Sequence, residues 1–357
     1  MQMTNDELYM QRCIELAKKG LGYTAPNPLV GSVVVHNNTI IGEGFHRKYG
    51  EAHAEANAIH SVAEKSLLAE STIYVNLEPC SHFGKTPPCA DLIINSGIKK
   101  VVIGCVDPFA QVAGRGIARL RNHGCDVTVG VLKPQNLKLN KRFFTFHEKK
   151  RPYIILKWAQ TTDGFIDTLR TPASGENALR ISGNLALSLV HKWRSEESAI
   201  MVGTNTALAD NPRLNVRYWT GPHPVRIVVD KNHTLPPNLR IFDKEHNTYV
   251  INESINHSEH NLNLVELPFI HEKIELNSLL EFLHQAEIQS VIIEGGQKLL
   301  QDFIQSGFWD EARILVSPAF LDKGVMAPNL PFENCTSTMI GIDRLVFCKN
   351  PANTYLL

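Results

Sequence analysis

The spacing of hydrophobic residues in the first third of the chain alternates between that of helices and that of strands. Tyr9, Cys13 and Leu16 share one face of a helix, which Gly20 is placed to end. Short apolar runs and helical spacings predict strands at 29–35, 39–44, 72–77, 100–105 and 126–131, and helices at 52–65, 89–96 and 117–123. This alternation is typical of helices packed on a mixed or parallel sheet.

A second alternating series begins near residue 153. It predicts strands at 153–158, 199–202, 225–229, 249–252, 291–294 and 312–316, and helices at 185–193, 276–285 and 298–306. A length of 357 residues suits two α/β domains, which we place at 1–146 and 147–357. Residues 133–151 are rich in Lys and Arg and lack core periodicity. They are predicted to form a linker that Phe143, Phe144 and Phe146 anchor to a domain surface.

Composition narrows the class of protein further. The 36 basic and 36 acidic residues balance, which excludes the broad basic field of a general nucleic-acid binder. No apolar run approaches the roughly 20 residues that span a membrane, and the N-terminus lacks the pattern of a secretory signal. The seven cysteines do not indicate a disulfide framework, so we expect a cytoplasmic location. The cysteines expected to be core thiols are Cys13, Cys105, Cys125, Cys335 and Cys348.

The strongest chemical signal joins His53-Ala54-Glu55 with Pro79-Cys80 and Cys89. Zinc favours imidazole and thiolate ligands, and a catalytic zinc site has three protein ligands and one position open to water. His53, Cys80 and Cys89 supply such a set. Glu55 follows His53 by two residues, so its carboxylate can move a proton near the metal without binding it.

Two other interpretations of this motif stay open. A cysteine pair with a distant histidine is often a structural zinc site or a pair of buried thiols, and His82 is a competing ligand. The order H-x-E…P-C-x-x-C is the signature of zinc deaminases. Here eight residues, SHFGKTPP, separate the two cysteines instead of two. The ligand types and the strand-to-helix context favour the catalytic interpretation.

Two glycine motifs are candidates for binding a dinucleotide. Gly114-Arg115-Gly116 lacks the third glycine and the acidic residue of the Rossmann fingerprint, so we set it aside. Glu294-Gly295-Gly296 follows a predicted buried strand and opens a predicted helix, where backbone N–H groups can hold a phosphate. The alternative is an ordinary turn between a strand and a helix.

Longer stretches of the chain resemble a known family. HAEANA, APNPLVGSVVV, PCSHFGKTPPC and DPFAQVAGRG in the first half are similar to the deaminase half of RibD, the bifunctional deaminase–reductases of riboflavin biosynthesis. KWAQTTDG, HKWRSEESAIMVGTNTALADNPRLNVR and IIEGG resemble the reductase half. The resemblance implies a cytidine-deaminase-like three-layer domain followed by a dihydrofolate-reductase-like α/β domain.

The same resemblance implies two consecutive reactions. The first is zinc-dependent hydrolytic deamination of 2,5-diamino-6-(5-phosphoribosylamino)pyrimidin-4(3H)-one. The second is reduction of the ribosyl group to ribityl by NADPH. The expected partner is thus a phosphorylated pyrimidine, with no nucleic acid and no membrane, and we expect a homo-oligomer formed through the reductase domain.

Residue roles carry over from the resemblance by position. The resemblance implies that His53, Cys80 and Cys89 bind zinc and that Glu55 transfers protons. The implied substrate contacts are Asn27, His46, Lys85, Asn177, Arg194, Leu214, Arg217 and Glu294. The implied NADPH contacts are Ala159, Thr206, Asp210, Lys231, Gly296, Gln297, Lys298, Leu299, Leu300, Gln301 and Asp302. Arg194 and Arg217 suit a phosphate clamp because guanidinium binds phosphate in a bidentate way. Either arginine is equally compatible with a solvated surface charge.

The chain departs from the family at two places. Phe109 stands where the family often has Asn, although Asp107 can still serve the substrate. Arg180-Ile181-Ser182 replaces a usual Trp-Ile-Thr. Two rival functions remain: a nucleoside or nucleic-acid zinc deaminase with a non-catalytic C-terminal domain, and a zinc-stabilised binding module without catalysis.

Overall fold

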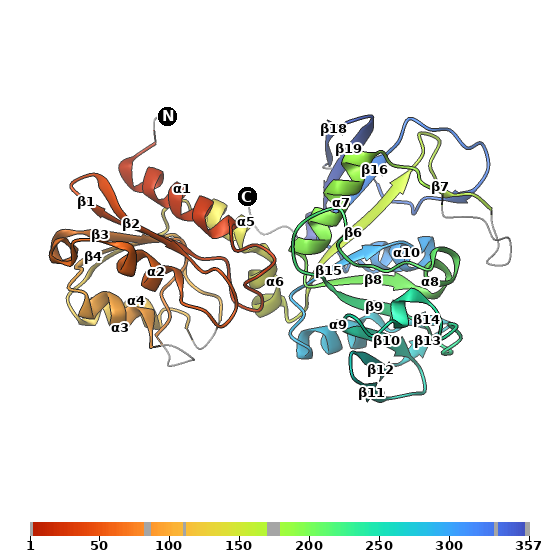
Figure 1. Cartoon of the computed structure of the whole chain (residues 1–357), viewed down its shortest axis with the longest axis horizontal. Coiled ribbons are helices and arrows are strands. Elements are labelled where there is room, and N and C mark those ends of the chain that lie inside the picture. Colours follow the sequence, from red (N-terminus) through yellow and green to blue (C-terminus); the bar gives the residue numbers. More distant parts are fainter. Residues whose placement is uncertain (1–2, 82–86, 110–111, 170–178, 332–334, 354–357) are drawn as a thin grey trace. The chain divides into compact units, whose positions relative to one another are not determined.

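The computed structural model describes residues 3–81, 87–109, 112–169, 179–331 and 335–353. The chain divides into two compact units, one ending at Lys150 and the other beginning at Arg151 (Figure 1). Within the described residues, no helix combines the length and apolar character needed to cross a membrane. The boundary predicted at 146–147 falls inside a helix, and we propose that the two domains divide after Lys150.

A five-stranded mixed sheet forms the centre of the first unit. Its strands are β1 (Gly31–His36), β2 (Thr39–Phe45), β3 (Thr72–Val75), β4 (Lys100–Ile103) and β5 (Asp126–Val129). They lie in the order β2-β1-β3-β4-β5. β3, β4 and β5 are parallel, and β1 is antiparallel to both of its neighbours. The carboxyl ends of β3 and β4 therefore lie at one edge, where the site residues follow.

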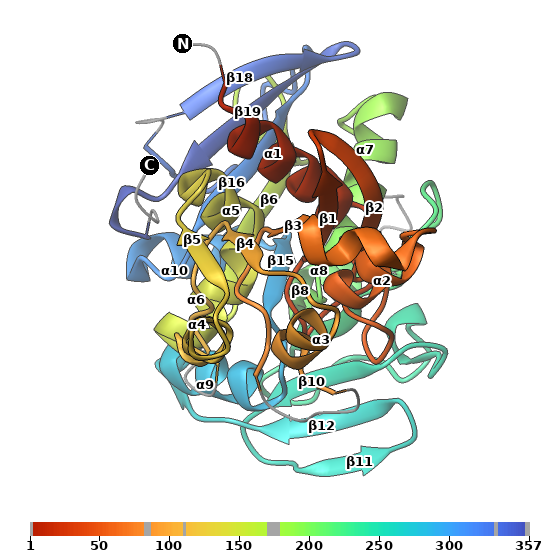
Figure 2. The same ribbon diagram turned by 90° about the vertical axis from the view of Figure 1, so that its left-hand side faces the viewer.

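Helices cover both faces of this sheet, as predicted. They are α1 (Asn5–Lys18), α2 (Ala54–Ser61), α3 (Cys89–Asn95), α4 (Arg115–Asn122), α5 (Lys133–Leu139) and α6 (Lys141–Lys149), with a 3₁₀ helix at Lys65–Glu70. In Figures 1 and 2, α1 and α5 lie on one side and α2, α3 and α4 on the other. Met10 and Leu16 pack on the first face, and Ala58, Ile93 and Leu120 on the second. The unit is a three-layer α/β domain.

The helix predicted at 52–65 is wrong at its C-terminal end. α2 stops at Ser61, and Val62 is extended. The Lys65 ammonium donates to the carbonyl oxygens of Ile59 and His60, at 2.7 and 3.0 Å. The Ile59 carbonyl oxygen also accepts the Val62 N–H at 3.3 Å, and the lysine adds a donor for carbonyls that no further helical turn follows.

The prediction that 133–151 is a linker is wrong, whereas its anchoring is confirmed. Residues 133–149 form α5 and α6, and the segment up to Lys150 belongs to the first unit. Phe143 and Phe144 are buried against Leu77 in one core cluster. At the junction of the helices, Asn140 accepts from the Leu29 N–H at 2.8 Å and donates to the Leu29 carbonyl oxygen at 3.0 Å. The lysines and arginines of residues 133–151 resemble the composition of a linker, but the segment is a packed pair of helices.

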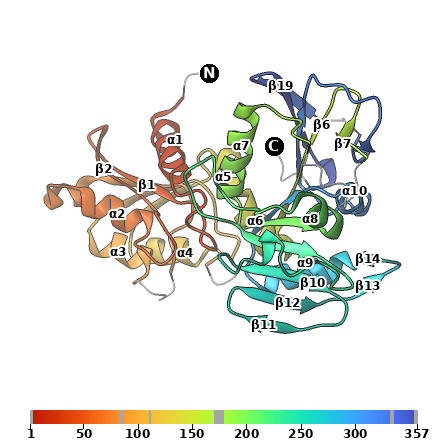
Figure 3. The same cartoon turned by 45° about the vertical axis from the view of Figure 1, so that its right-hand side comes forward.

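The second unit is built on a ten-stranded sheet in the order β11-β12-β10-β9-β8-β15-β6-β16-β19-β18. Its strands are β6 (Tyr153–Gln160), β8 (Ala199–Gly203), β9 (Val225–Val229), β10 (Thr248–Asn252), β11 (His257–Glu259), β12 (Leu262–Glu266), β15 (Ser290–Glu294), β16 (Glu311–Val316), β18 (Cys335–Ile340) and β19 (Asp343–Lys349). The strands from β12 to β16 are parallel, and the edges are antiparallel. In Figure 3, β11 and β12 lie at one end of this unit and β19 at the other.

Among the described residues, two helices cover each face of this sheet. Ala186 and Val190 of α7 (Asn184–Glu196) and Ala207 of α8 (Thr204–Asp210) pack on one face. Leu283 of α9 (Leu276–Gln285) and Phe303 of α10 (Gln297–Ser306) pack on the other. Two small two-stranded sheets, β13 (Phe269–Ile270) with β14 (Lys273–Ile274) and β7 (Phe165–Asp167) with β17 (Val325–Met326), complete the unit.

Cys335 and Cys348 correct a prediction. They are direct partners in the antiparallel pair of β18 and β19 and form a disulfide, not two core thiols. Residues directly opposite on antiparallel strands bring their side chains together, and β18 and β19 are not among the predicted strands. Cys13, Cys105 and Cys125 are buried free thiols, as predicted.

Candidate active sites

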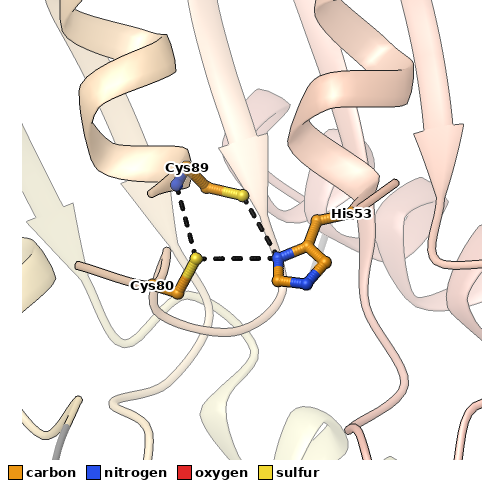
Figure 4. A group of neighbouring side chains, drawn as sticks. All are labelled: His53, Cys80 and Cys89. Atoms are coloured by element: carbon orange, nitrogen blue, oxygen red, sulfur yellow. Dashed lines mark hydrogen bonds between the residues drawn. The ribbon is translucent and has the colours of Figure 1, made fainter. Parts of the chain in front are cut away.

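Three side chains from three different elements meet at one edge of the first sheet. His53 is the residue before α2, Cys80 follows β3, and Cys89 begins α3. The His53 Nδ1 atom lies 3.6 Å from the Cys80 Sγ atom and 3.3 Å from the Cys89 Sγ atom (Figure 4). The Cys89 backbone N–H also donates to the Cys80 sulfur at 3.3 Å. One nitrogen and two sulfurs therefore face a common point.

The donor set fits zinc. All three ligand atoms lie within 4.8 Å of one another. A nitrogen at about 2.0 Å and a sulfur at about 2.3 Å from a tetrahedral zinc ion are about 3.5 Å apart. The hydrogen bond between the two cysteine side chains lowers the pKa of Cys80 to about 4 and raises the pKa of Cys89. One thiolate is thus favoured before any metal charge acts on the pair.

Glu55 is buried next to this ligand set and is not part of it. It lies in the first turn of α2, two residues after His53, and is 3% exposed. Burial raises its pKa to about 7, although the nearby His53 opposes the shift. A carboxyl group with a pKa near neutrality can both accept and return a proton. The arrangement suits a proton carrier beside a metal.

Glu78 organises the loop that follows β4. Its buried carboxylate accepts the backbone N–H groups of Gly116 and Ile117 at 2.9 and 3.1 Å through one oxygen. The other oxygen accepts those of Asp107 and Gly114 at 3.2 and 3.0 Å. Four N–H donors on one carboxylate fix the start of α4 against the segment that leads into Cys80.

The structure requires glycine at positions 114 and 116 for reasons unrelated to nucleotide binding. Gly114 has a φ of 74° just before α4, in the left-handed region that favours glycine. A Cβ atom on Gly116 would lie 2.0 Å from the Pro79 carbonyl oxygen. The glycine allows α4 to approach the segment that carries Cys80, which agrees with setting this motif aside.

In the second unit, Glu294 collects two cations at the carboxyl end of β15. Arg194 of α7 binds both of its oxygens, at 2.8 and 2.7 Å. Lys157, its direct partner on β6, lies at 3.2 Å. Burial alone would raise the pKa of Glu294, but the charges of Arg194 and Lys157 outweigh it and lower the pKa to about 2.

Arg217 adds a further positive charge to this cluster. It is exposed and hydrogen-bonds through its guanidinium to the Asn215 side chain. Among the described residues, no carboxylate lies within ion-pair distance of it. Arg194 is occupied by Glu294 and by the Asn215 carbonyl oxygen at 3.3 Å. Arg217 is therefore better placed than Arg194 to bind an added anion.

The turn between β15 and α10 requires glycine. Gly295 and Gly296 have φ values of 103° and 76°. A Cβ atom on Gly295 would lie 3.1 Å from Thr206, and one on Gly296 3.4 Å from it. No side chain caps α10 at its N-cap residue, Gly296. The first N–H groups of α10, beside Thr206, form a cradle suited to a phosphate group.

Comparison with known proteins finds a matching protein family for each of the two units. The model of the cytidine and deoxycytidylate deaminase zinc-binding region matches residues 3–105. The RibD C-terminal domain model matches residues 152–340. The chain is 37% identical to riboflavin biosynthesis protein RibD of Aquifex aeolicus, covering 96% of this chain and 98% of that one. The chain belongs to the RibD family. Its two units are those of a bifunctional riboflavin biosynthesis deaminase/reductase.

Two further relatives support the RibD assignment. RibD of Actinobacillus pleuropneumoniae is 42% identical over 87% of this chain and 83% of its own. A crystal structure of a diaminohydroxyphosphoribosylaminopyrimidine deaminase/5-amino-6-(5-phosphoribosylamino)uracil reductase from Thermotoga maritima is 37% identical. It superposes with a TM-score of 0.85 over 97% of this chain and 99% of that chain. The predicted fold, a cytidine-deaminase-like unit followed by a RibD C-terminal α/β unit, is confirmed.

Two of the RibD-like substrate positions in the first unit lie side by side. Asn27 Nδ2 donates to His46 Nε2 at 3.1 Å, and His46 Nδ1 donates to the Ala52 carbonyl oxygen at 3.2 Å. Burial lowers the pKa of His46, so the ring is neutral. The His46 ring lies 5.3 Å from that of His53. Lys85 and Asn177, two other implied substrate contacts, lie outside the described residues.

Two departures from the RibD pattern have structural counterparts. Phe109 packs against the His147 ring at 4.9 Å, and its N–H donates to Asp107 at 2.8 Å. Burial raises the pKa of Asp107 to about 7. Arg180 is exposed and hydrogen-bonds to Asn184 at the start of α7.

The remaining implied NADPH positions differ in their surroundings. Leu299 and Leu300 are buried in the core, as is the implied substrate residue Leu214. Their side chains face hydrophobic neighbours, which leaves the backbone for any ligand contact. Lys231 is paired with Glu253 and Glu272, and Asp302 with Lys273. Gln301 accepts from the Asn329 N–H at 2.8 Å. Ala159 lies on β6, Asp210 ends α8, and Gln297 and Lys298 begin α10.

The sequence did not single out Glu78 or Lys157. Glu78 stands directly before Pro79-Cys80, so its position in the deaminase motif is a signal that could have found it. Lys157 lies in KWAQTTDG, near the carboxyl end of a predicted strand. In parallel sheets, the side chains at the carboxyl ends of the strands commonly form the ligand-binding site.

Proposed function

We propose that the first unit releases ammonia from 2,5-diamino-6-(5-phosphoribosylamino)pyrimidin-4(3H)-one, and that the second unit then reduces the ribosyl group with NADPH. The observation that carries this proposal is the meeting of His53, Cys80 and Cys89 beside the buried carboxyl group of Glu55. The Thermotoga maritima relative is named for both a deaminase and a reductase. The product would be 5-amino-6-(5-phosphoribitylamino)uracil.

In the deaminase unit, His53, Cys80 and Cys89 would hold zinc. Bound there, zinc would lower the pKa of a water molecule and polarise it for attack. Glu55 would accept a proton from the attacking water and return it to the nitrogen that leaves as ammonia. Asn27, held by the neutral His46, would orient the pyrimidine, and Asp107 would contact it from the β4 side. Lys85 and His46 are proposed contacts to the ribose phosphate.

In the reductase unit, the first N–H groups of α10 and the Gly295-Gly296 turn would hold NADPH phosphate. NADPH would supply a hydride to the ribosyl C1′ carbon. Thr206 would pack over the turn, with Ala159, Asp210, Lys231 and the 296–302 segment as further cofactor positions. The protein's share of this step is to position the two reactants.

The substrate phosphate would bind among the cations near Glu294. Arg217 has no described ion-pair partner, and Lys157 and Arg194 bring two charges to a single carboxylate. This local excess of positive charge is what a phosphate monoester requires. We propose that Arg217 contacts the phosphate and that Arg194 and Glu294 fix the substrate side of the site. Asn177 and Leu214 remain proposed contacts.

Two broader expectations also stay predictions. One is a homo-oligomer formed through the reductase unit. The other is a cytoplasmic location.

A coupled assay on the full-length chain tests the proposed function. Ammonia and NADPH are followed separately on the diaminopyrimidinone phosphate. We expect ammonia release with or without NADPH, and one NADPH oxidised for each ammonia released when both are present. Cytidine serves as the comparison substrate. Release of ammonia from cytidine, with no NADPH oxidation on the pyrimidine phosphate, would instead support the single-function deaminase.

A further inference from the structure

Two histidines hold the backbone that leads into Arg217. The Val216 N–H donates to His223 Nδ1 at 3.1 Å, and the Arg217 N–H donates to His191 Nδ1 at 3.0 Å. The preceding residue is fixed from a third side, because Arg194 donates to the Asn215 carbonyl oxygen. Ordinary loops satisfy such N–H groups with water or backbone, whereas here two consecutive groups depend on imidazole rings.

His191 performs this task from a fully enclosed position. It lies on α7, one helical turn before Arg194, and is 1% exposed. Since Nδ1 accepts a hydrogen bond, the neutral ring carries its proton on Nε2. That Nε2 atom is buried and has no hydrogen-bond partner among the described residues. The edge-to-face ring of Tyr218 lies 4.9 Å away.

A second proton on His191 would be unfavourable for two reasons. It would place an N–H donor against the Arg217 N–H, which is itself a donor. The charged groups that act on the ring are Arg194 on α7, Arg217 in the loop, Glu294 on β15 and Lys157 on β6. Three are cations. Burial and the three cations lower the pKa of His191 to about 4 against the opposing charge of Glu294, so the accepting form persists at neutral pH.

We propose that His191 is a positioning residue of the reductase site: its unprotonated Nδ1 fixes the backbone of Arg217, and so fixes where the guanidinium meets the substrate phosphate. This inference rests on the proposed role of Arg217. His223 supports the neighbouring residue in the same way, but it is less buried and stacks on the His246 ring at 4.3 Å. His191 is the histidine that bonds Arg217 itself.

The choice of replacement side chain makes the proposal testable. The Oδ1 atom of asparagine can stand close to where histidine has Nδ1, so His191→Asn retains an acceptor for the Arg217 N–H. His191→Gln carries the same amide but places it farther along the side chain. His191→Leu removes the acceptor altogether. Comparison of Asn with Gln separates the position of the acceptor from polarity and bulk.

The experiment measures the reductase step of the full-length chain on deaminated pyrimidine phosphate. We expect His191→Leu and His191→Gln to raise KM for this substrate about 10- to 100-fold, since the partly buried Arg217 N–H loses its acceptor and no longer holds the arginine in place. His191→Asn should restore most of the loss. KM for NADPH should stay within about two-fold in all three variants, which shows that the unit is folded.

Arg217→Ala separates failure of this inference from failure of the proposed function. If Arg217→Ala raises the same KM while Asn and Gln at position 191 give equal values, the positioning role is refuted and the role of Arg217 stands. If Arg217→Ala leaves that KM unchanged, Arg217 does not bind the phosphate and both proposals are overturned. If His191→Leu does not fold, the Asn–Gln comparison still decides.

Discussion

Replacing Glu55 with glutamine is expected to lower ammonia release about 100- to 10,000-fold, the usual contribution of a positioned acid–base group. The amide has nearly the shape of the carboxyl group but cannot carry the proton from water to the leaving nitrogen. Zinc content should be unchanged, because Glu55 is not among the three proposed ligands. Reduction of already deaminated substrate should also be unchanged. The measurements are ammonia release, bound metal and NADPH oxidation.

Glu70→Gln is the matched control for Glu55→Gln. Glu70 is an exposed residue of the same unit, at the end of the 3₁₀ helix, so the same chemical change there should leave ammonia release unaffected. An ordinary deamination rate in Glu55→Gln would show that another group moves the proton, and it would favour the zinc-stabilised binding module.

Replacing Glu294 with glutamine is expected to have the largest effect on the reductase unit. The change leaves the largely buried cations Arg194 and Lys157 without their carboxylate. Removal of one partner from a buried ion pair costs about 3–5 kcal/mol. We expect NADPH oxidation on the deaminated substrate to be lost and the thermal transition of this unit to fall, while ammonia release by the first unit continues.

Glu259→Gln is the control for that experiment, because Glu259 pairs with Lys244 at an exposed position and surface pairs contribute about 0–1 kcal/mol.

The pH dependence of stability adds a second test of the Glu294 ion pairs. The pKa of Glu294 is about 2 in the folded protein against 4.5 for an unperturbed group. The unfolded chain therefore takes up the proton first, and this contribution to stability, complete above pH 4.5, is lost as the pH falls toward 2. A Glu294→Gln protein with wild-type stability and an identical acid profile would contradict the assignment.

Much of the fold could be predicted because its cores follow simple periodicities. β1, β3 and β4 are short apolar runs, and α1, α9 and α10 have one apolar face, so their positions agree with the prediction within a few residues. The elements that the sequence did not predict are mostly small or exposed. The side chains of β18 alternate little between buried and exposed. The strand lies at a sheet edge, where it pairs with β19 on one side only. Without β18, the disulfide between Cys335 and Cys348 could not be foreseen.

The candidate zinc residues could be picked out of the sequence because zinc restricts the residue types that bind it. His53, Cys80 and Cys89 are the right types, and their strand-to-helix positions brought them together as expected. Glu78 carries no comparable signal, since its partners are four backbone N–H groups, which any residue provides. Its role becomes visible only when the loop after β4 folds back over the end of β3.

The reductase site was harder to predict for a related reason. Arg194 is a suitable phosphate ligand by residue type, yet the structure pairs it with Glu294 through two hydrogen bonds. Nothing in the spacing of residues 194 and 294, or of His191 and Arg217, indicates that they touch. These contacts depend on the register that sets Lys157 opposite Glu294 and on the path of the loop after α8.

Removal of the metal tests most directly whether the two units carry separate reactions. The full-length protein is stripped with a chelator and given either the diaminopyrimidinone phosphate or its deaminated product, with NADPH present in both cases. We expect no ammonia from the first compound, undiminished NADPH oxidation on the second, and recovery of ammonia release when zinc is restored. Loss of both activities together, or ammonia release that survives complete loss of metal, would contradict a zinc centre at His53, Cys80 and Cys89 that works independently of the reductase site.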